Sequence, residues 1–232
     1  MNKKINLPTK ITLARIILAI ILIISIFILY FLDLFKVIDI SSFNLYINSE
    51  KNIYVNLINL IILIVFLIAS LTDFLDGYIA RKYNLVTDLG KFLDPLADKM
   101  LINSLMIFLS LNFVSLSNMN DYSSSKEVTI IFPFFAVILM VIRDLVVDSL
   151  RFMGASKQKV IAANIYGKIK TVTQMIAITL VLLNDLPFSL FDIDFIPYLH
   201  ISDIMCYVAL FFSLLSGIIY FKDNFKVLFD EK

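Results

Sequence analysis

Five aspartates lie between residues 73 and 98, in the stretch DFLDGYIARKYNLVTDLGKFLDPLAD. Asp73 and Asp76 are three residues apart, and Asp94 and Asp98 are four residues apart. On a helix each pair lies on one face, separated by roughly 40–60° around the axis. Carboxylates at this spacing repel one another. The two pairs therefore require cations that neutralise them.

Divalent metal ions are the cations that such carboxylates suit. Hard oxygen ligands favour Mg²⁺ or Mn²⁺, and four carboxylates can bridge two such ions. Two neighbouring metal ions are the recurring arrangement for in-line displacement at phosphorus. Acids at a membrane edge can also be plain solvated charges, and Asp88, which has no partner at helical spacing, is assigned to that class. The paired spacing predicts two metal ions bound by Asp73, Asp76, Asp94 and Asp98.

Two glycines and an arginine accompany the paired acids. Gly77 directly follows Asp76, and glycine inside a helix costs roughly 1 kcal/mol relative to alanine. Its presence is explained if a ligand or a neighbouring helix approaches the backbone closely, and Gly90 raises the same expectation. Arg81 follows Asp76 by one turn and a residue, where its guanidinium is well placed to bind phosphate oxygens.

The composition indicates a membrane protein. The 232 residues are 60% hydrophobic and 17% charged, and the mean hydropathy is +0.91. These values exclude an ordinary soluble domain, and a formal charge of +1 gives no case for a nucleic-acid partner. The single cysteine, Cys206, excludes a disulfide framework and a cysteine metal site. Inside lipid the backbone must form helices or a closed barrel, and the long continuous apolar runs favour helices.

The chain is predicted to form one all-α integral membrane domain over residues 1–232, with six transmembrane helices. The apolar segments lie at roughly 11–32, 53–72, 93–116, 128–150, 169–186 and 201–221. The first is interpreted as a retained transmembrane helix, because its apolar run is too long for a secretory signal and no small-residue cleavage site follows it.

The basic residues predict the orientation of these helices. Of the 20 Lys and Arg residues, only Lys36, Lys51 and Lys126 lie in the loops after the first and third segments, and the loop after the fifth has none. The positive-inside rule then makes both termini and the other two loops cytoplasmic. The aspartate pairs are therefore expected at the cytoplasmic boundary, where a water-soluble substrate can meet a lipid.

The acidic stretch resembles a known family signature. The pattern Asp73-x-x-Asp76-Gly77-x-x-Ala80-Arg81, eight residues, Gly90-x-x-x-Asp94-x-x-x-Asp98 is similar to the complete signature of the CDP-alcohol phosphatidyltransferases, with all eight fixed positions filled. Six membrane helices with a cytoplasmic motif at the ends of the second and third also match that family. The resemblance implies that the alcohol attacks the β-phosphorus of CDP-diacylglycerol and that CMP leaves.

The same resemblance implies roles for individual residues. Asp73, Asp76 and Asp94 would hold the metal ions, while Asp98 would both contact metal and act as general base. The residues expected to line the CDP-diacylglycerol site are Asp76, Gly77, Ala80, Arg81 and Gly90. The resemblance also implies a homodimer.

A second, basic cluster bears on the choice of alcohol. Arg143 lies within an apolar run and so needs an anionic partner, and Arg151 is eight residues further, close to the same helix face. Lys168 and Lys170 open the fifth segment. One interpretation is that these cations only fix topology, with Asp144 and Asp148 as partial counter-ions. The other is an anion site for the phosphate of the acceptor, which guanidinium groups suit.

This region resembles the glycerophosphate-using branch of the family, the bacterial phosphatidylglycerophosphate synthases. The similar stretches are Gly167-Lys168-Ile169-Lys170-Thr171 and the N-terminal NLPTKITLAR, with Asn6, Pro8, Thr12 and Arg15. Asp144 departs from the branch, which commonly has glutamate there. The resemblance implies a bacterial cell-membrane enzyme that uses sn-glycerol 3-phosphate.

Three alternatives stay open. A cardiolipin synthase of the same fold, or an inositol-phosphate-using relative, could also exploit a basic acceptor site. From another class, a divalent-cation transporter would carry carboxylates in its membrane segments. A transporter is disfavoured because its acids are expected near the bilayer midplane, whereas these lie at one boundary.

Overall fold

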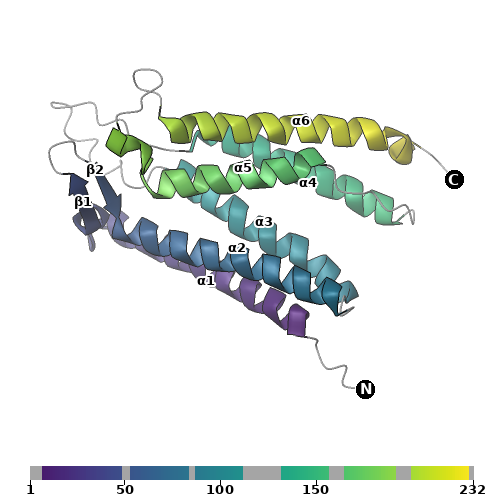
Figure 1. Ribbon diagram of the computed structural model, residues 1–232, viewed down its shortest axis with the longest axis horizontal. Coiled ribbons are helices and arrows are strands. Elements are labelled where there is room, and N and C mark those ends of the chain that lie inside the picture. Colours follow the sequence, from purple (N-terminus) through teal and green to yellow (C-terminus); the bar gives the residue numbers. More distant parts are fainter. Residues whose placement is uncertain are drawn as a thin grey trace. The chain divides into compact units, whose positions relative to one another are not determined.

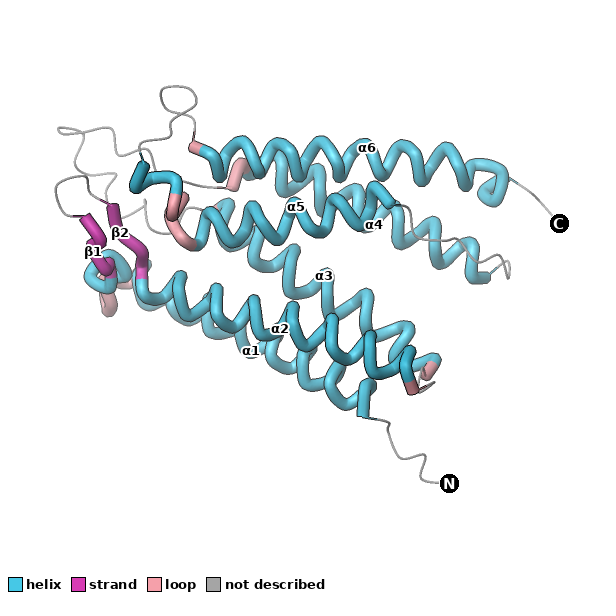
Figure 2. Tube along the Cα trace, in the orientation of Figure 1, coloured by secondary structure: helices cyan, strands magenta, loops and turns pink. Residues whose placement is uncertain are grey.

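The computed structural model describes residues 7–48, 53–83, 87–111, 132–156, 165–191 and 200–229. All six predicted segments contain an α-helix (Figures 1 and 2). The described elements fall into two compact units. The first unit contains the first two helices and most of the third, and the second unit contains the last three.

The first unit consists of helices α1 (Leu7–Leu34), α2 (Leu57–Lys82) and α3 (Asp88–Ser110) with a β-hairpin between α1 and α2. Helices α1 and α2 pack side by side (Figure 1). The outer surface of these helices is apolar. On α1, for example, Ile17 and Phe27 have 57% and 63% of their surface exposed. Such exposure would be unfavourable in water and is ordinary for a helix that faces lipid.

The hairpin pairs strand β1 (Asn44–Asn48) with strand β2 (Ile53–Asn56) antiparallel. Asn56 ends β2 and starts α2, because its side-chain oxygen accepts a hydrogen bond of 2.9 Å from the backbone N–H of Ile58. The amide nitrogen of Asn56 donates to the backbone oxygen of Ile40 and to the side chain of Asn44, both at 2.9 Å. One buried asparagine thus connects the hairpin to the helix that follows.

The second unit consists of α4 (Phe134–Ser156), α5 (Ile165–Leu182) and α6 (Ile201–Phe229). Helix α6 packs against both α4 and α5. Most of its buried residues are small and recur at helical spacing, among them Ala209, Ser213 and Ser216, which are fully buried. Small residues on one helix face allow close packing of membrane helices. The buried carboxylate of Asp185 accepts hydrogen bonds from the first two N–H groups of α6, at 3.0 and 2.9 Å, and so caps that helix.

Four of the described helices are long and apolar enough to cross a membrane. They are the spans Thr9–Asp33, Leu57–Ala80, Ile165–Leu182 and Ile201–Phe225. Helices α3 and α4 are also long, at 23 residues each, but they carry the charged residues on which the site predictions rest. The all-helical prediction is therefore confirmed, apart from the small hairpin.

The boundaries differ from those expected. Residues 53–56 form strand β2 instead of opening the second helix, which continues to Lys82. The third helix begins at Asp88, five residues before the expected start at 93. Residues 183–186 form turns after α5. The expected helical parts at 112–116 and 128–131 lie outside the described residues.

Candidate active site

The acidic residues of the first unit lie within α2 and α3. Asp73 and Asp76 occupy the last third of α2, and Asp94 and Asp98 occupy the second and third turns of α3. Asp76 is buried, with 3% of its surface exposed. The side chains of Asp73 and Asp94 are 43% and 47% exposed, and Asp98 is half-buried. The acids therefore lie where a buried position opens to the surface of this unit.

Helix α1 joins three of these carboxylates through Arg15. The buried guanidinium, with only 2% of the side chain exposed, forms an ion pair with Asp73 through Nη1. Its Nη2 atom lies 3.9 Å from Asp76 Oδ2 and 3.8 Å from Asp94 Oδ1. These two separations are ion-pair distances, longer than hydrogen bonds. The structure thus brings Asp73, Asp76 and Asp94 around one cation.

Thr12, one turn before Arg15 on α1, also touches both acidic helices. Its hydroxyl donates a hydrogen bond of 2.8 Å to Asp94 Oδ1 and lies 3.4 Å from Asp76 Oδ2. A hydroxyl has a single proton, so the shorter contact to Asp94 is the stronger one. Thr12 is itself buried. Helix α1 therefore contributes both a charge and a hydrogen bond to the acidic pairs.

The function of Arg15 and Thr12 was not predicted from the sequence, where they served only as part of a similar N-terminal stretch. The signal was available in Arg15. An arginine inside an apolar run needs an anionic partner, and Arg15 lies in such a run just as Arg143 does. The paired aspartates of the second and third segments were candidates for such a partner.

The other residues of the predicted donor site lie on the same two helices. Gly77 and Ala80 are half-buried on α2, directly after the acidic pair. Arg81 belongs to α2 and Asp88 begins α3, but their side chains lie outside the described part of the structure. Gly90 is buried on α3.

Gly90 has a close neighbour that explains its type. Its N–H donates a hydrogen bond of 3.0 Å to Oγ1 of Thr87, which caps the start of α3. A Cβ atom added at Gly90 would lie 3.1 Å from that oxygen and 3.7 Å from Oγ1 of Thr9. The two threonine hydroxyls are 2.9 Å apart. The expected close approach to Gly90 therefore occurs, and within the protein it comes from this threonine pair.

The carboxylate oxygens around Arg15 suit a hard cation. Among the residues that the structure describes, no three Asp, Glu, His or Cys side chains converge closely enough to form a metal site by themselves. However, Asp73, Asp76 and Asp94 already surround one positive group. Three carboxylates carry more negative charge than one guanidinium can neutralise. Carboxylate oxygen is also the ligand that Mg²⁺ and Mn²⁺ prefer. The chemistry of these residues therefore fits divalent cations.

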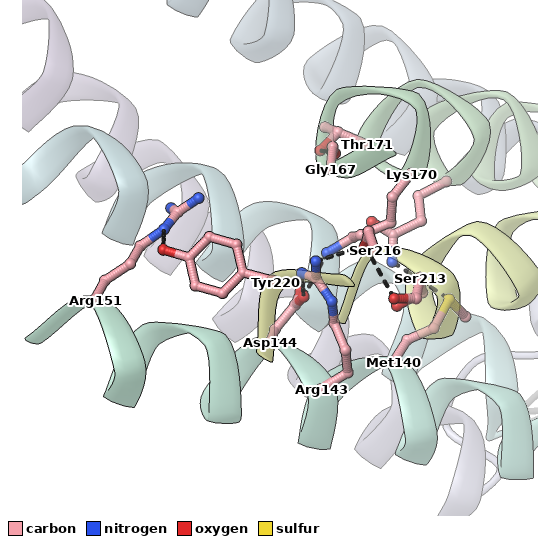
Figure 3. Close-up of polar contacts among 11 residues, drawn as sticks. Met140, Arg143, Asp144, Arg151, Gly167, Lys170, Thr171, Ser213, Ser216 and Tyr220 are labelled. Atoms are coloured by element: carbon pink, nitrogen blue, oxygen red, sulfur yellow. Dashed lines mark hydrogen bonds and ion pairs between the residues drawn. The ribbon is translucent and has the colours of Figure 1, made fainter. Parts of the chain in front are cut away.

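The second unit contains a buried cluster of opposite sign (Figure 3). Arg143 and Asp144 are neighbours on α4, and Lys170 reaches them from α5. One carboxylate oxygen, Oδ1 of Asp144, accepts contacts from Nη1 of Arg143 at 2.9 Å and from Nζ of Lys170 at 2.5 Å. Asp144 and Lys170 are 3% and 6% exposed. We call Arg143 and Lys170, held on this oxygen, the cation pair.

The remaining predicted acceptor residues lie apart from the cation pair. Nε of Arg151 donates a hydrogen bond of 3.2 Å to the hydroxyl of Tyr220, and its guanidinium lies 5.5 Å from the centre of that ring. Figure 3 shows this contact further along α4 than Arg143. Lys168 is exposed on α5. Of the four predicted acceptor residues, Arg143 and Lys170 are therefore the two that share a contact.

Comparison with known proteins gives one family. The family described as CDP-alcohol phosphatidyltransferase matches residues 5–215. A Bacillus subtilis protein named CDP-diacylglycerol–glycerol-3-phosphate 3-phosphatidyltransferase is 38% identical over 226 residues, which cover 96% of this chain and 97% of its own. A Rickettsia bellii protein of the same name is 30% identical over 94% of both chains. A cardiolipin synthase (CMP-forming) of Oryza sativa subsp. japonica is 38% identical over 122 residues, 51% of this chain and 35% of its own.

The chain belongs to the CDP-alcohol phosphatidyltransferase family, since the family match covers most of its length. The resemblance drawn from the aspartate pattern is thereby confirmed. Together with its long apolar helices, the family membership makes it a multi-pass membrane protein.

Proposed function

We propose that this protein transfers a phosphatidyl group from CDP-diacylglycerol to sn-glycerol 3-phosphate, giving phosphatidylglycerophosphate and CMP. The proposal is supported by family membership and by similarity, over nearly the whole chain, to relatives named for this reaction. The observation that carries the choice of acceptor is the buried cation pair on Asp144. Its two positive charges against one negative charge suit an acceptor that itself bears phosphate.

The proposed reaction needs a base and a leaving group. Asp98, half-buried on α3, accepts the proton of the attacking hydroxyl. The alcohol oxygen forms a bond to the β-phosphorus, the bond from that phosphorus to the CMP oxygen breaks, and CMP leaves with the electron pair. General-base catalysis of this kind contributes about 10²–10⁴-fold. Gly77, Ala80, Arg81 and Gly90 line the donor site in this proposal.

Two divalent cations, Mg²⁺ or Mn²⁺, would be held by Asp73, Asp76, Asp94 and Asp98, and when bound they would neutralise the pyrophosphate of the donor. Arg15 and Thr12 orient the carboxylates of Asp73, Asp76 and Asp94 through the contacts described above. Arg143, Arg151 and Lys170 attract and orient the acceptor phosphate, and the exposed Lys168 adds only a screened surface charge.

The proposal extends to topology and assembly. All six helices cross the bacterial cell membrane, both termini are cytoplasmic, and the active site faces the cytoplasm, as the distribution of basic residues favours. Membrane lipids surround the apolar exterior. A homodimer is also proposed, and it rests on the family resemblance.

One experiment tests the reaction directly. Purified protein is incubated with CDP-diacylglycerol and each of several alcohols: glycerol 3-phosphate, phosphatidylglycerol, inositol phosphate and serine. The lipid product is then identified by mass spectrometry. We expect phosphatidylglycerophosphate from glycerol 3-phosphate. Cardiolipin as the main product would replace the proposed acceptor with phosphatidylglycerol, and no lipid product from any alcohol would reject the transferase function.

A further inference from the structure

The cation pair is held by residues whose roles follow from their contacts. Asp144 places both cations on a single oxygen atom, Oδ1, so that neither can move without breaking a buried ion pair. Asp144 itself is almost fully buried, with 3% exposed. A carboxylate in that position both neutralises one of the two charges and fixes the distance between them.

Helix α6 holds the other side of the Arg143 guanidinium. Its Nη2 donates a hydrogen bond of 2.5 Å to Oγ of Ser216. The same hydroxyl donates its single proton to the backbone oxygen of Ser213, at 3.0 Å. The lone pairs of Ser216 are thereby turned toward Arg143 (Figure 3). Ser216 is fully buried, so its orientation is not averaged by water.

Gly217, the next residue on α6, provides the space through which the Arg143 side chain passes. A Cβ atom added at Gly217 would lie 2.9 Å from Cγ of Arg143 and 3.3 Å from its Nε. Cγ is near the base of the side chain, so rotation of the flexible far end does not relieve the contact. A glycine inside a helix is normally unfavourable, and at this position its lack of a side chain is what admits Arg143.

The cluster is built more like a binding site than a stabilising contact. A buried ion pair is on average no better for stability than apolar residues of the same volume. Here a second buried cation, Lys170, shares the carboxylate oxygen that already contacts Arg143. Nε of Arg143 is also buried without a hydrogen-bond partner in the described part of the structure. A buried guanidinium donor without a partner is suited to an anionic ligand, which would accept its hydrogen bond.

We propose that Asp144, Ser216 and Gly217 are positioning residues that fix Arg143 and Lys170 as one cationic unit, and that this fixed geometry sets the KM for a phosphate-bearing acceptor. The proposal rests on the proposed function, because it names the acceptor of that reaction. It assigns to three residues of α4 and α6 a role in acceptor affinity.

The first test uses a matched pair of glycine substitutions. Gly217→Ala places a methyl group against Arg143, whereas a Cβ at Gly167 on α5 meets nothing within 4 Å, so Gly167→Ala is the control. We expect Gly217→Ala to raise the KM for glycerol 3-phosphate about 10-fold, the lower bound for losing one charge-assisted hydrogen bond. The kcat at saturating acceptor and the KM for CDP-diacylglycerol stay at the wild-type values. Gly167→Ala leaves all three constants unchanged.

The second test removes the oxygen that accepts a hydrogen bond from the Arg143 guanidinium, and it adds no volume. Ser216→Ala deletes the oxygen that receives Nη2 of Arg143. We again expect a higher KM for glycerol 3-phosphate, by about 10-fold, because one hydrogen bond with a charged donor is lost. This variant decides the matter if Gly217→Ala does not fold.

Asp144 is tested by two substitutions of different severity. Asp144→Asn removes the charge that both cations share, and we expect the KM for glycerol 3-phosphate to rise by about 100-fold or more, together with a loss of thermal stability in detergent. Asp144→Glu keeps the charge and should restore the KM to within about 3-fold of wild type. A residue needed for folding alone would change stability and kcat without this separation of the two KM values.

Two failures are distinguishable. Wild-type turnover of glycerol 3-phosphate, with unchanged KM in both Gly217→Ala and Ser216→Ala, overturns the positioning role and leaves the proposed function intact. No product from glycerol 3-phosphate with the wild-type protein overturns the proposed function, and the positioning role with it.

Discussion

The first unit surrounds one guanidinium with three carboxylates, whereas the second surrounds one carboxylate with a guanidinium and an ammonium group. In both clusters the central group is buried: Arg15 is 4% exposed and Asp144 is 3% exposed. Among the described contacts, three carboxylates surround the one guanidinium of Arg15, and two cations share one oxygen of Asp144. The central group of each cluster thus contacts more than one group of the opposite charge.

This difference indicates which ligand each cluster can take. The excess negative charge around Arg15 attracts cations, and the partly exposed side chains of Asp73 and Asp94 keep that position accessible. The guanidinium and ammonium groups that share Asp144 suit an anion. A buried counter-ion within the protein lowers the energetic cost of a charged site in the membrane when no ligand is bound. The four predictions below test whether the two clusters act separately on metal and acceptor.

The largest expected effect is the loss of activity on metal removal. EDTA should abolish product formation, and Mg²⁺ or Mn²⁺ should restore it, because the carboxylates of the first unit repel one another when no divalent cation is bound. Product formation is measured against free metal concentration. The control is Arg143→Ala, which should need the same metal concentration for half its own maximal rate. Full activity in a rigorously metal-free preparation would contradict the two-metal site.

The next effect concerns proton transfer. Asp98→Asn should lower kcat by about 10²–10⁴-fold, the usual consequence of removing a general base, while CDP-diacylglycerol still binds. Turnover and donor binding are measured on the same preparation. Asp223→Asn, the same substitution at an exposed position of α6, serves as the control and should behave as wild type. Near-normal turnover of Asp98→Asn would remove the base assignment.

A smaller effect is expected at the cation pair. Arg143→Ala should raise the KM for glycerol 3-phosphate by about 10- to 150-fold, since a charge-assisted hydrogen bond is worth roughly 1.5–3 kcal/mol. The KM for CDP-diacylglycerol should stay nearly constant. Arg143→Lys should recover only part of the loss, because lysine lacks the planar pair of donors.

The exposed Lys168 provides an internal comparison for Arg143. Because water and salt screen charges at the surface, Lys168→Ala should change the acceptor KM by less than about 3-fold. Equal effects of Arg143→Ala on the two substrates would contradict an acceptor site and favour a purely topological role for these basic residues.

The smallest effect is expected at Thr12. Thr12→Val keeps the shape of the side chain and removes the hydrogen bond to Asp94. We expect the metal concentration for half-maximal rate to change by about 2- to 10-fold, in line with roughly 0.5–1.5 kcal/mol for one hydrogen bond. Ser149→Ala on α4, an exposed hydroxyl that bonds only its own helix in the contacts described here, is the control. A change in acceptor KM with no change in metal requirement would contradict the separation of the clusters.

The acidic pairs could be predicted because their information is local. Spacings of three and four residues fix a common helix face whatever the rest of the fold does. The buried acid Asp76 and its partner Asp73 are indeed on α2, and Asp94 and Asp98 are on α3. Family membership could also be predicted, since the signature depends only on residue types and their spacing within one stretch of the sequence.

The contacts between helices could not be predicted in the same way. Nothing in the local pattern states that Arg15 lies against Asp73, because the two are 58 residues apart in the sequence. Charge balance nevertheless gave a partial rule: an arginine in an apolar helix must have an anion. The pairing of Lys170 with Asp144 follows the same rule, yet which of the nearby acids it meets depends on how α4, α5 and α6 pack.

The hairpin was missed because hydropathy does not distinguish its second strand from a helix. The apolar run from Ile53 continues into α2 with only Asn56 and Asn59 interrupting it, and short apolar runs are ambiguous between the two structures. Asn56 was the available signal. Asparagine is a favoured residue immediately before a helix, and its side chain does accept the hydrogen bond from Ile58.

The contact between Arg15 and the aspartates also imposes an order on biosynthesis. Asp73 follows Arg15 by 58 residues and Asp94 follows it by 79, so at roughly 5–20 residues per second the first acid is made about 3–12 s after the arginine. During that interval the first helix enters the membrane with an unmatched positive charge. Arg15 lies near the beginning of the span Thr9–Asp33, where a long side chain can reach the lipid headgroups. Lipid phosphates can thus serve as its temporary partner until the second helix arrives and the protein's own carboxylates replace them.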